Sequence, residues 1–264
     1  MKIWTLTENT AVRDGLKAEH GLSLYIEANG KRILFDAGQS DAFRDNALEM
    51  GIDLNMVDFA VLSHGHYDHG GGLLRFLEEN EKAPVYISRF AFGEYYNAKD
   101  HYIGLSPCLE NVSRLIHVGE EQKLAEGITL VSCRDREVGI PVDSAGLQKK
   151  ENGMLLPDDF VHEQYLILEE QGLRVVISGC SHRGILNIIR WLPCDVLIGG
   201  FHFMKKDPEG ADVREAAKQL LQENTMYYTC HCTGLEQYAA MKKIMGGKLH
   251  YLAAGSCIQL GEDA

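Results

Sequence analysis

The sequence predicts a mixed α/β fold, and its strand-rich halves with interspersed helices suit two sheets packed face to face with helices on the outside. Short apolar runs end in polar or histidine-containing loops, stretches of helical periodicity separate them, and this alternation occurs twice. No repeat, low-complexity segment or Pro/Ser-rich linker divides the 264 residues. We therefore expect a single domain over residues 1–264, with a long irregular insertion or lid at about 95–159.

The first half is expected to be rich in strands. Gly30 lies where a hairpin turn would join the second and third strands, and Gly51 follows the first helix as a C-terminal residue. The strands are expected at residues 3–8, 22–28, 32–36, 59–63 and 85–87, and the helices at residues 41–50 and 73–79.

The second half repeats the alternation after a less regular section. A hairpin across Gln171-Gly172 is expected to join strands at residues 165–168 and 173–177. Further strands are expected at residues 195–198 and 226–229, and helices at residues 184–191, 211–223 and 235–245. Long irregular segments often cover binding sites, so residues 95–159 are interpreted as a lid or, equally, as a surface excursion.

Composition points to a globular protein outside the membrane. Hydrophobic residues make up 45% and charged residues 24% of the chain, and no run approaches the roughly 20 apolar residues of a membrane span. The N-terminus enters a strand pattern without the apolar core of a signal peptide. Seven cysteines without a secretion signal argue against a disulfide framework. We expect a cytoplasmic protein with reduced thiols.

The net charge of −12 argues against nucleic acid as a partner, because nonspecific nucleic-acid binding depends on an excess of lysine and arginine. The expected partner is a small, anionic substrate held by local basic residues. A homo-oligomer is compatible with the sequence.

The segment from Ser63 to His69 is the most informative part of the chain. It places four potential metal ligands, His64, His66, Asp68 and His69, at offsets of two, two and one after an apolar run. These are too many for one structural site closed by a single segment. They fit two adjacent positions, His64 with His66 and Asp68 with His69. Imidazole suits zinc and carboxylate suits harder cations, so we expect one or two divalent ions: zinc first, with manganese or iron as alternatives.

Three further histidines, His182, His202 and His231, each follow an apolar strand. In a layered fold they would emerge along the same edge as the first cluster. His182 and His231 are expected to bind metal, and His202 or His231 to complete the coordination or stabilise a departing group. Cys230 and Cys232 flank His231 at the spacing of alternate strand residues, which predicts that they face the same way.

Several other residues are candidates for supporting roles. Asp36 is expected to accept a hydrogen bond from a ligand histidine and fix its tautomer. Arg183 stands at a helix start and is expected to bind an anionic substrate group. Lys149 and Lys150 could close over the same ligand from the long irregular segment.

The motifs together resemble the metallo-β-lactamase superfamily. The resemblance rests on His-x-His-x-Asp-His after a strand and on the segments at residues 33–38, 178–182, 199–202 and 229–234. It implies a four-layer αββα sandwich. The residues of the last three segments are similar to the motifs of a subgroup named for a dihydropterin–ribofuranosylaminobenzene phosphate synthase.

The sequence departs from the superfamily at two points. Where a Gly-Asp pair normally supplies an aspartate that bridges the metals, this chain has Gly179-Cys180. A thiolate at Cys180 would favour zinc. The usual upstream histidine is also missing, and His162 is only a rough positional substitute.

The leading hypothesis is a metal-dependent hydrolase, in which the ion would lower the pKa of bound water to about 7. Asp68 would bind a second metal or act as general base. The alternative implied by the subgroup's name is a metal-dependent transferase that displaces pyrophosphate from a pterin. A third hypothesis is an iron-binding redox or sensor protein built around Cys230-His231-Cys232.

Overall fold

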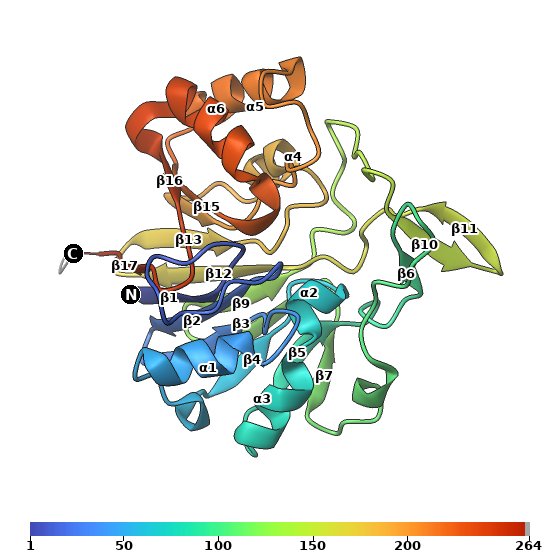
Figure 1. Cartoon of the computed structure of the whole chain (residues 1–264), viewed down its shortest axis with the longest axis vertical. Coiled ribbons are helices and arrows are strands. Elements are labelled where there is room, and N and C mark those ends of the chain that lie inside the picture. Colours follow the sequence, from blue (N-terminus) through green and yellow to red (C-terminus); the bar gives the residue numbers. More distant parts are fainter. Residues whose placement is uncertain (262–264) are drawn as a thin grey trace.

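The computed structural model describes residues 1–261 as two seven-stranded sheets stacked between two layers of helices (Figure 1). The first sheet has the strand order β17-β1-β2-β3-β4-β5-β7. Its strands are β1 (Lys2–Thr7), β2 (Ser23–Ala28), β3 (Lys31–Phe35), β4 (Phe59–Val61), β5 (Val85–Ser88), β7 (Leu115–Val118) and β17 (Cys257–Gln259). Strands β3, β4, β5 and β7 are parallel, and the other pairs are antiparallel.

The second sheet has the order β16-β15-β14-β13-β12-β9-β8 and the same division into parallel and antiparallel pairs. Its strands are β8 (Glu121–Ala125), β9 (Ile128–Val131), β12 (Tyr165–Glu170), β13 (Leu173–Ile177), β14 (Val196–Ile198), β15 (Met226–Thr229) and β16 (Leu249–Tyr251). Strands β13 to β16 are the parallel ones.

Alternating apolar side chains explain why the sheets stack. Ile33 and Phe35 of β3 and Val175 and Ile177 of β13 belong to one buried cluster between the sheets. The intervening residues face outward and pack under helices. The helices that cover the first sheet are α1 (Ala42–Glu49) and α3 (Leu73–Glu79). Those that cover the second sheet are α4 (Ile185–Trp191), α5 (Ala211–Gln222) and α6 (Leu235–Met245). This is the predicted αββα sandwich, and its four layers can be followed from bottom to top of Figure 1.

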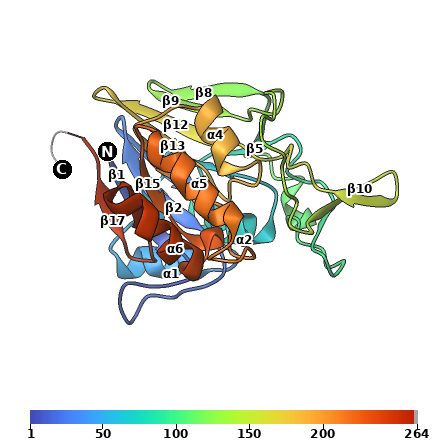
Figure 2. The ribbon, with the colours of Figure 1, turned by 90° about the horizontal axis from the view of Figure 1, so that it is seen from above.

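Shorter elements complete the fold. A third, three-stranded sheet contains β6 (Tyr95–Tyr96), β10 (Gln148–Glu151) and β11 (Met154–Pro157). The β10–β11 hairpin projects from the body of the molecule in both views (Figures 1 and 2). The remaining short helices are α2 (Tyr67–Gly70), η1 (Leu54–Met56), η2 (Pro107–Leu109), η3 (His231–Thr233) and η4 (Gly246–Lys248).

The expectation of irregular structure throughout 95–159 is wrong for its middle. Strands β7, β8 and β9 lie there and complete both large sheets. Their patterns were weak because β8 has no buried residue and β7 exposes its two central side chains. Only the parts before and after these strands lie outside the sandwich. Within residues 1–261, no helix combines the length and the apolar character needed to cross a bilayer.

Candidate metal centre

The candidate residues gather where parallel strands of both sheets end. Asp36 follows β3 and Ser63 to His69 follow β4; on the other sheet, Cys180 and His182 follow β13, His202 follows β14 and His231 follows β15. Because the carboxyl ends of parallel strands share one edge, the topology brings all of these segments to the same end of the sandwich. Sequence reasoning predicted this convergence from the placement of the histidines.

Close approach of the two halves depends on Gly179. A Cβ atom at this position would lie 2.2 Å from Ser63 Oγ and 3.2 Å from His64 Nδ1. Only a residue without a side chain lets the β13 loop pass this close to the β4 loop. The glycine therefore sets the distance between the histidine loop and the Cys180–His182 segment.

Two groups of potential ligands result. His64, His66 and His182 are buried, and their donor atoms lie within 4.8 Å of one another. The nitrogens His64 Nε2 and His182 Nε2 are 3.2 Å apart. The second group is formed by Asp68, His69, Cys180 and His231. His69 Nε2 lies 3.3 Å from His231 Nε2 and 3.1 Å from Cys180 Sγ, and Asp68 Oδ2 lies 3.4 Å from His231 Nε2.

Asp36 fixes the tautomers of two of these histidines. Its carboxylate accepts hydrogen bonds from His69 Nδ1 at 2.6 Å and from Ser63 Oγ at 2.7 Å. Ser63 Oγ has thereby used its only proton, so it accepts from His64 Nδ1 at 2.8 Å. Both imidazoles thus carry hydrogen on Nδ1 and present a lone pair at Nε2. This is the geometry expected for Asp36 from the sequence.

Asn9 fixes His231 in the same way. His231 Nδ1 donates to Asn9 Oδ1 at 2.8 Å, which leaves the lone pair of a neutral His231 on Nε2. The lone pairs of His69 and His231 therefore point at each other, with the Asp68 carboxylate beside them. In the first group, His66 Nε2 and His182 Nδ1 are buried and have no hydrogen-bond partner among residues 1–261. Buried nitrogens without partners are unfavourable, and a cation bound among them would remove that cost, so the ligand set fits a divalent metal.

Burial keeps most of these imidazoles neutral. It lowers the pKa of His66 to about 3 and that of His202 to about 4, and it lowers the pKa values of His64 and His182 well below the ordinary range. Neutral imidazole is the form that binds metal.

His231 and Asp68 behave differently because they interact with each other. Burial alone would lower the pKa of His231, but the hydrogen bond with Asp68 raises it overall. Burial alone would raise the pKa of Asp68, yet the neighbouring imidazoles His69 and His231 hold it below its usual value. Asp68 thus favours positive charge at this position, which a bound cation would also supply.

The backbone is strained where these residues are presented. Asp36, Ser181, His202 and His231 all have φ angles in the left-handed region, at 59°, 56°, 56° and 49°. Such conformations cost free energy in residues other than glycine and cluster at functional sites. Each follows the end of a strand, where the turn redirects the side chain toward the centre.

The cysteines near the centre do not share one face. Cys230 packs in the core between the sheets. Cys180 and Cys232 instead line the cavity at the candidate metal centre, which is called the metal cavity below. The prediction that Cys230 and Cys232 face the same way is wrong because β15 ends at Thr229 and the chain turns into the short helix η3. Burial raises the pKa of Cys180. Burial also opposes ionisation of Cys232, but its hydrogen bond with Cys180 and the nearby His231 lower its pKa overall.

The three basic residues suggested for substrate binding lie elsewhere. Arg183 is buried and donates to the carbonyl oxygens of Cys133, at 2.7 Å, and Arg134, at 3.2 Å. Lys149 pairs with Asp159, at 2.9 Å, and Lys150 pairs with Glu94, at 3.1 Å, on the projecting sheet. Their contacts tie the chain to itself, so the structure does not bring these three cations to the metal cavity.

A different lysine does reach the cavity. The space at the centre has a volume of about 200 Å³, and Lys205 lines it together with His202, His20 and Asp68. Lys205 has no salt-bridge partner among residues 1–261, and its charge contributes to the low pKa of His202. Sequence reasoning missed Lys205, although its position three residues after His202 could have indicated it.

Other contributors were also missed or only suggested. His20 Nε2 lies 3.3 Å from Asp68 Oδ2. Behind the histidine loop, His162 Nδ1 accepts from the backbone N–H of Gly65 at 2.9 Å, and its Nε2 lies 3.2 Å from Asp158. His162 therefore holds the loop rather than replacing the missing upstream histidine in the same place. The Thr7-Glu8-Asn9 segment at the end of β1 could have indicated Asn9 as a partner of the site, because its polar residues also end a buried strand.

A four-layer αββα sandwich with a His-x-His-x-Asp-His loop at the strand ends defines the metallo-β-lactamase class of folds. Residues 16–203 match the model of the Metallo-beta-lactamase superfamily, and the chain belongs to this family. The crystal structure of Tm1679, described as a metal-dependent hydrolase of the beta-lactamase superfamily, is 27% identical; it superposes with a TM-score of 0.84 over 99% of this chain and 100% of that chain.

Two relatives from Methanocaldococcus jannaschii are similar over most of their length. An uncharacterized protein is 28% identical, with 90% of this chain and 93% of the relative aligned. The 7,8-dihydropterin-6-methyl-4-(beta-D-ribofuranosyl)-aminobenzene-5'-phosphate synthase is 31% identical, with 89% of this chain and 88% of the relative aligned.

Proposed function

We propose that the protein is a metal-dependent hydrolase acting on a small, anionic, phosphate- or carboxylate-bearing substrate. The observation that carries the proposal is the pair of imidazole lone pairs, on His69 Nε2 and His231 Nε2, that face each other at 3.3 Å beside the Asp68 carboxylate. In the adjacent group, His66 Nε2 and His182 Nδ1 have no hydrogen-bond partner among residues 1–261, whereas a purely structural cluster would supply one. Family membership supports the same reading.

The ligand groups support two adjacent metal positions. His64, His66 and His182 would hold one ion, and Asp68, His69 and His231 the other, with Cys180 where the family's bridging aspartate normally stands. When bound, the metal supplies Lewis acidity, which polarises the substrate and acidifies water. The thiol of Cys180 favours zinc, with manganese and iron as alternatives.

The chain's own residues would position substrate and protons. Asp68 has a pKa held below its usual value, so its carboxylate is an acceptor that can bind metal or orient a water molecule. His202 lines the cavity and lies against His182, with ring centroids 4.3 Å apart. From there it can hydrogen-bond to a departing group. Lys205 supplies the unpaired positive charge that an anionic substrate needs.

A second candidate is a metal-dependent transferase that displaces pyrophosphate from a pterin. It is favoured by the 31% identity to the archaeal synthase over nearly the whole chain. Both reactions would use the same donors, so the geometry does not separate them. Product analysis separates them. A transferase gives a product in which the pterin is joined to its acceptor, whereas a hydrolase gives a product in which water has taken the acceptor's place.

The test is hydrolysis of p-nitrophenyl phosphate and bis(p-nitrophenyl) phosphate by the protein reconstituted with zinc, manganese or iron(II). His64→Ala should abolish any turnover, and His117→Ala, on the exposed face of β7, should retain it. A pterin pyrophosphate with an arylamine acceptor tests the second candidate in parallel. If no metal supports turnover of any of these substrates, both proposed reactions are contradicted.

A further inference from the structure

A second, larger cavity lies directly beside the metal cavity. Its volume is about 570 Å³, against about 200 Å³ for the metal cavity. Ala145, His182, His202 and Lys206 line both spaces. A group bound in the larger cavity would therefore lie next to two of the histidines of the centre.

The walls of the larger cavity are largely apolar. They come from the loop around residue 142, the start of α4, the loop after β14 and one face of α5. The apolar side chains include Ile140, Pro141, Val142, Ile185, Phe201 and Phe203. Cavities of this size and character, with a few polar groups at the edge, are typical of small-molecule sites.

Hydrogen bonds and ion pairs hold the outer wall in place. The side-chain amide of Asn187 on α4 accepts from the Ile140 N–H at 2.9 Å and donates to the Ile140 carbonyl at 2.8 Å. Lys206 pairs with Asp143 on the same loop and with Asp212 on α5. Part of the segment interpreted as a lid from the sequence thus forms one side of this cavity.

The larger cavity is lined by an excess of carboxylates, whereas the metal cavity is not. In the larger cavity, the ammonium group of Lys206 is neutralised by two carboxylates, and Glu215 adds a further negative charge. The metal cavity is lined by one carboxylate, that of Asp68, and by Lys205, which has no salt-bridge partner among the described residues. An anion is favoured only at the metal cavity, because the carboxylates of the larger cavity repel it.

We infer that the larger cavity binds an uncharged apolar part of the substrate, an aromatic ring system or an acyl chain, while the substrate's anionic group lies at Lys205 and the histidines. The inference rests on the proposed function for the position of the reacting group. It specifies the substrate as an elongated molecule with one apolar and one anionic end. Val142 and Phe203 are then specificity-determining residues, since they line the apolar cavity.

The test compares 1-naphthylmethylphosphonate with methylphosphonate by isothermal titration calorimetry on the metal-containing protein. Neither compound has a hydrolysable ester bond. The naphthyl compound should bind at least about 10-fold more tightly, because its ring is removed from water. Val142→Trp should fill the cavity and abolish this preference. Val138→Trp, on the same loop but outside the cavity, should retain it.

Equal affinity of the wild type for both phosphonates would overturn the inference. So would a preference that survives in Val142→Trp. Phe203→Ala gives an independent check if the tryptophan variant does not fold: it should weaken naphthyl binding by about 5-fold and leave methylphosphonate binding unchanged. A naphthyl preference without turnover of 1-naphthyl phosphate or any other ester would contradict the proposed hydrolase and leave the apolar site standing.

Discussion

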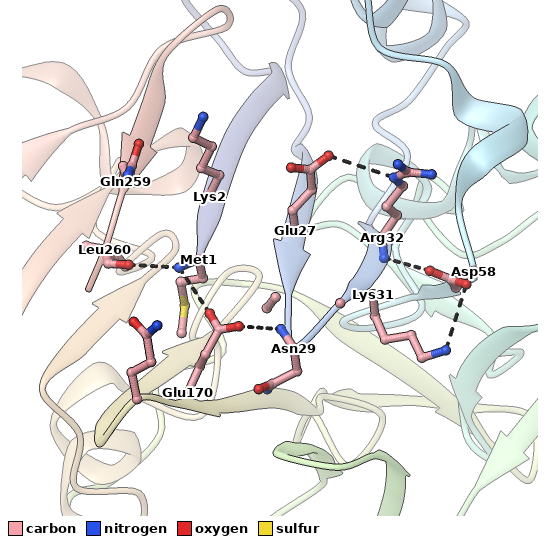
Figure 3. A pocket seen from close by; sticks show the side chains of 13 residues that line it. Met1, Lys2, Glu27, Asn29, Lys31, Arg32, Asp58, Glu170, Gln259 and Leu260 are labelled. Atoms are coloured by element: carbon pink, nitrogen blue, oxygen red, sulfur yellow. Dashed lines mark hydrogen bonds and ion pairs between the residues drawn. The ribbon is translucent and has the colours of Figure 1, made fainter. Parts of the chain in front are cut away.

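The two ends of the stacked sheets handle polar groups in opposite ways. At the end away from the metal centre, a polar hollow of about 580 Å³ is lined by charged groups, most of which lie beside opposite charges (Figure 3). Glu170 binds the amino group of Met1, at 3.0 Å, and the backbone N–H of Asn29, at 2.7 Å. Arg32 and Lys31 lie 3.9 Å from Glu27 and Asp58, respectively.

At the metal end, acceptors face acceptors instead. Asp36 and Asn9 orient His69 and His231 so that their Nε2 atoms converge at 3.3 Å, and the Cys180 thiol lies 3.1 Å from His69 Nε2. Polar groups that are paired within the chain stabilise it, whereas groups left to converge at a buried point are available for a ligand. The difference separates a surface hollow from a candidate site, even though the hollow is the larger space.

The largest expected effect is loss of activity on removing a ligand. His64→Ala should lower kcat/KM by at least about 100-fold, because the metal's stabilisation of developing charge is worth several kcal/mol. The measurement is steady-state hydrolysis after reconstitution, with His117→Ala as the control. A His64→Ala enzyme within about 3-fold of the wild type would contradict the assignment of this histidine.

Metal affinity should distinguish two aspartates placed at opposite ends of the sandwich. Asp36→Ala removes the acceptor that orients His69 and should weaken metal binding by about 10- to 100-fold. Asp58→Ala, at the other end, should leave affinity unchanged. Competition with a chromophoric chelator measures both. Equal affinities of the two variants would remove the role proposed for Asp36.

The metal-free protein should lose stability in acid. Burial lowers the pKa values of His66 and His202 to about 3 and about 4, from the value of 6.5 of a free histidine, so the unfolded chain binds more protons than the folded one in this window. Stability is therefore complete above pH 6.5 and is lost as the pH falls toward 4. The raised pKa of His231 makes stability change with pH in the opposite direction, but this is the contribution of one group against that of several.

Thermal unfolding followed by circular dichroism should show this as a decrease in Tm of about 5 °C or more between pH 7 and pH 5. His66→Gln should flatten the dependence, whereas His117→Gln should leave it unchanged. A Tm independent of pH in the metal-free protein would mean that the imidazoles are not held neutral by burial.

Cobalt should report on the thiol that stands where the family normally has a bridging aspartate. Substitution with cobalt(II) should give a thiolate-to-metal charge-transfer absorption, because Cys180 Sγ lies 3.1 Å from His69 Nε2. Cys180→Ser should remove the band and weaken binding by about 10-fold. Cys194→Ser, outside the cavity, should retain it. A spectrum unaffected by Cys180→Ser would exclude the thiol as a ligand.

The smallest effect is expected at the polar hollow. Glu170→Gln should change the free energy of unfolding by about 1 kcal/mol or less, because ion pairs near the surface contribute little. Metal content and activity should be unchanged. Urea unfolding measures the first and elemental analysis the second. Loss of metal in this variant would show that the two ends of the molecule are not independent.

The sequence was sufficient where the local pattern determines the outcome. The His-x-His-x-Asp-His loop, Asp36 after its strand and the helix at Leu73–Glu79 lie as expected, because apolar runs followed by polar turns fix strand ends. It was insufficient where tertiary contacts decide. Arg183 is bound by two carbonyls from a distant segment, and β8 has no buried face that periodicity could detect. Cys230 and Cys232 separate because a turn, not a strand, carries them.

The central claim is that the converging lone pairs hold metal, and metal content per chain tests it most directly. Wild-type protein and His66→Ala would be purified without chelators or added metal, reconstituted with zinc, dialysed and measured by elemental analysis. The wild type should retain two equivalents, and His66→Ala should lose at least one of them. A folded wild-type protein that retains no metal after separate reconstitution with zinc, manganese and iron would contradict the account.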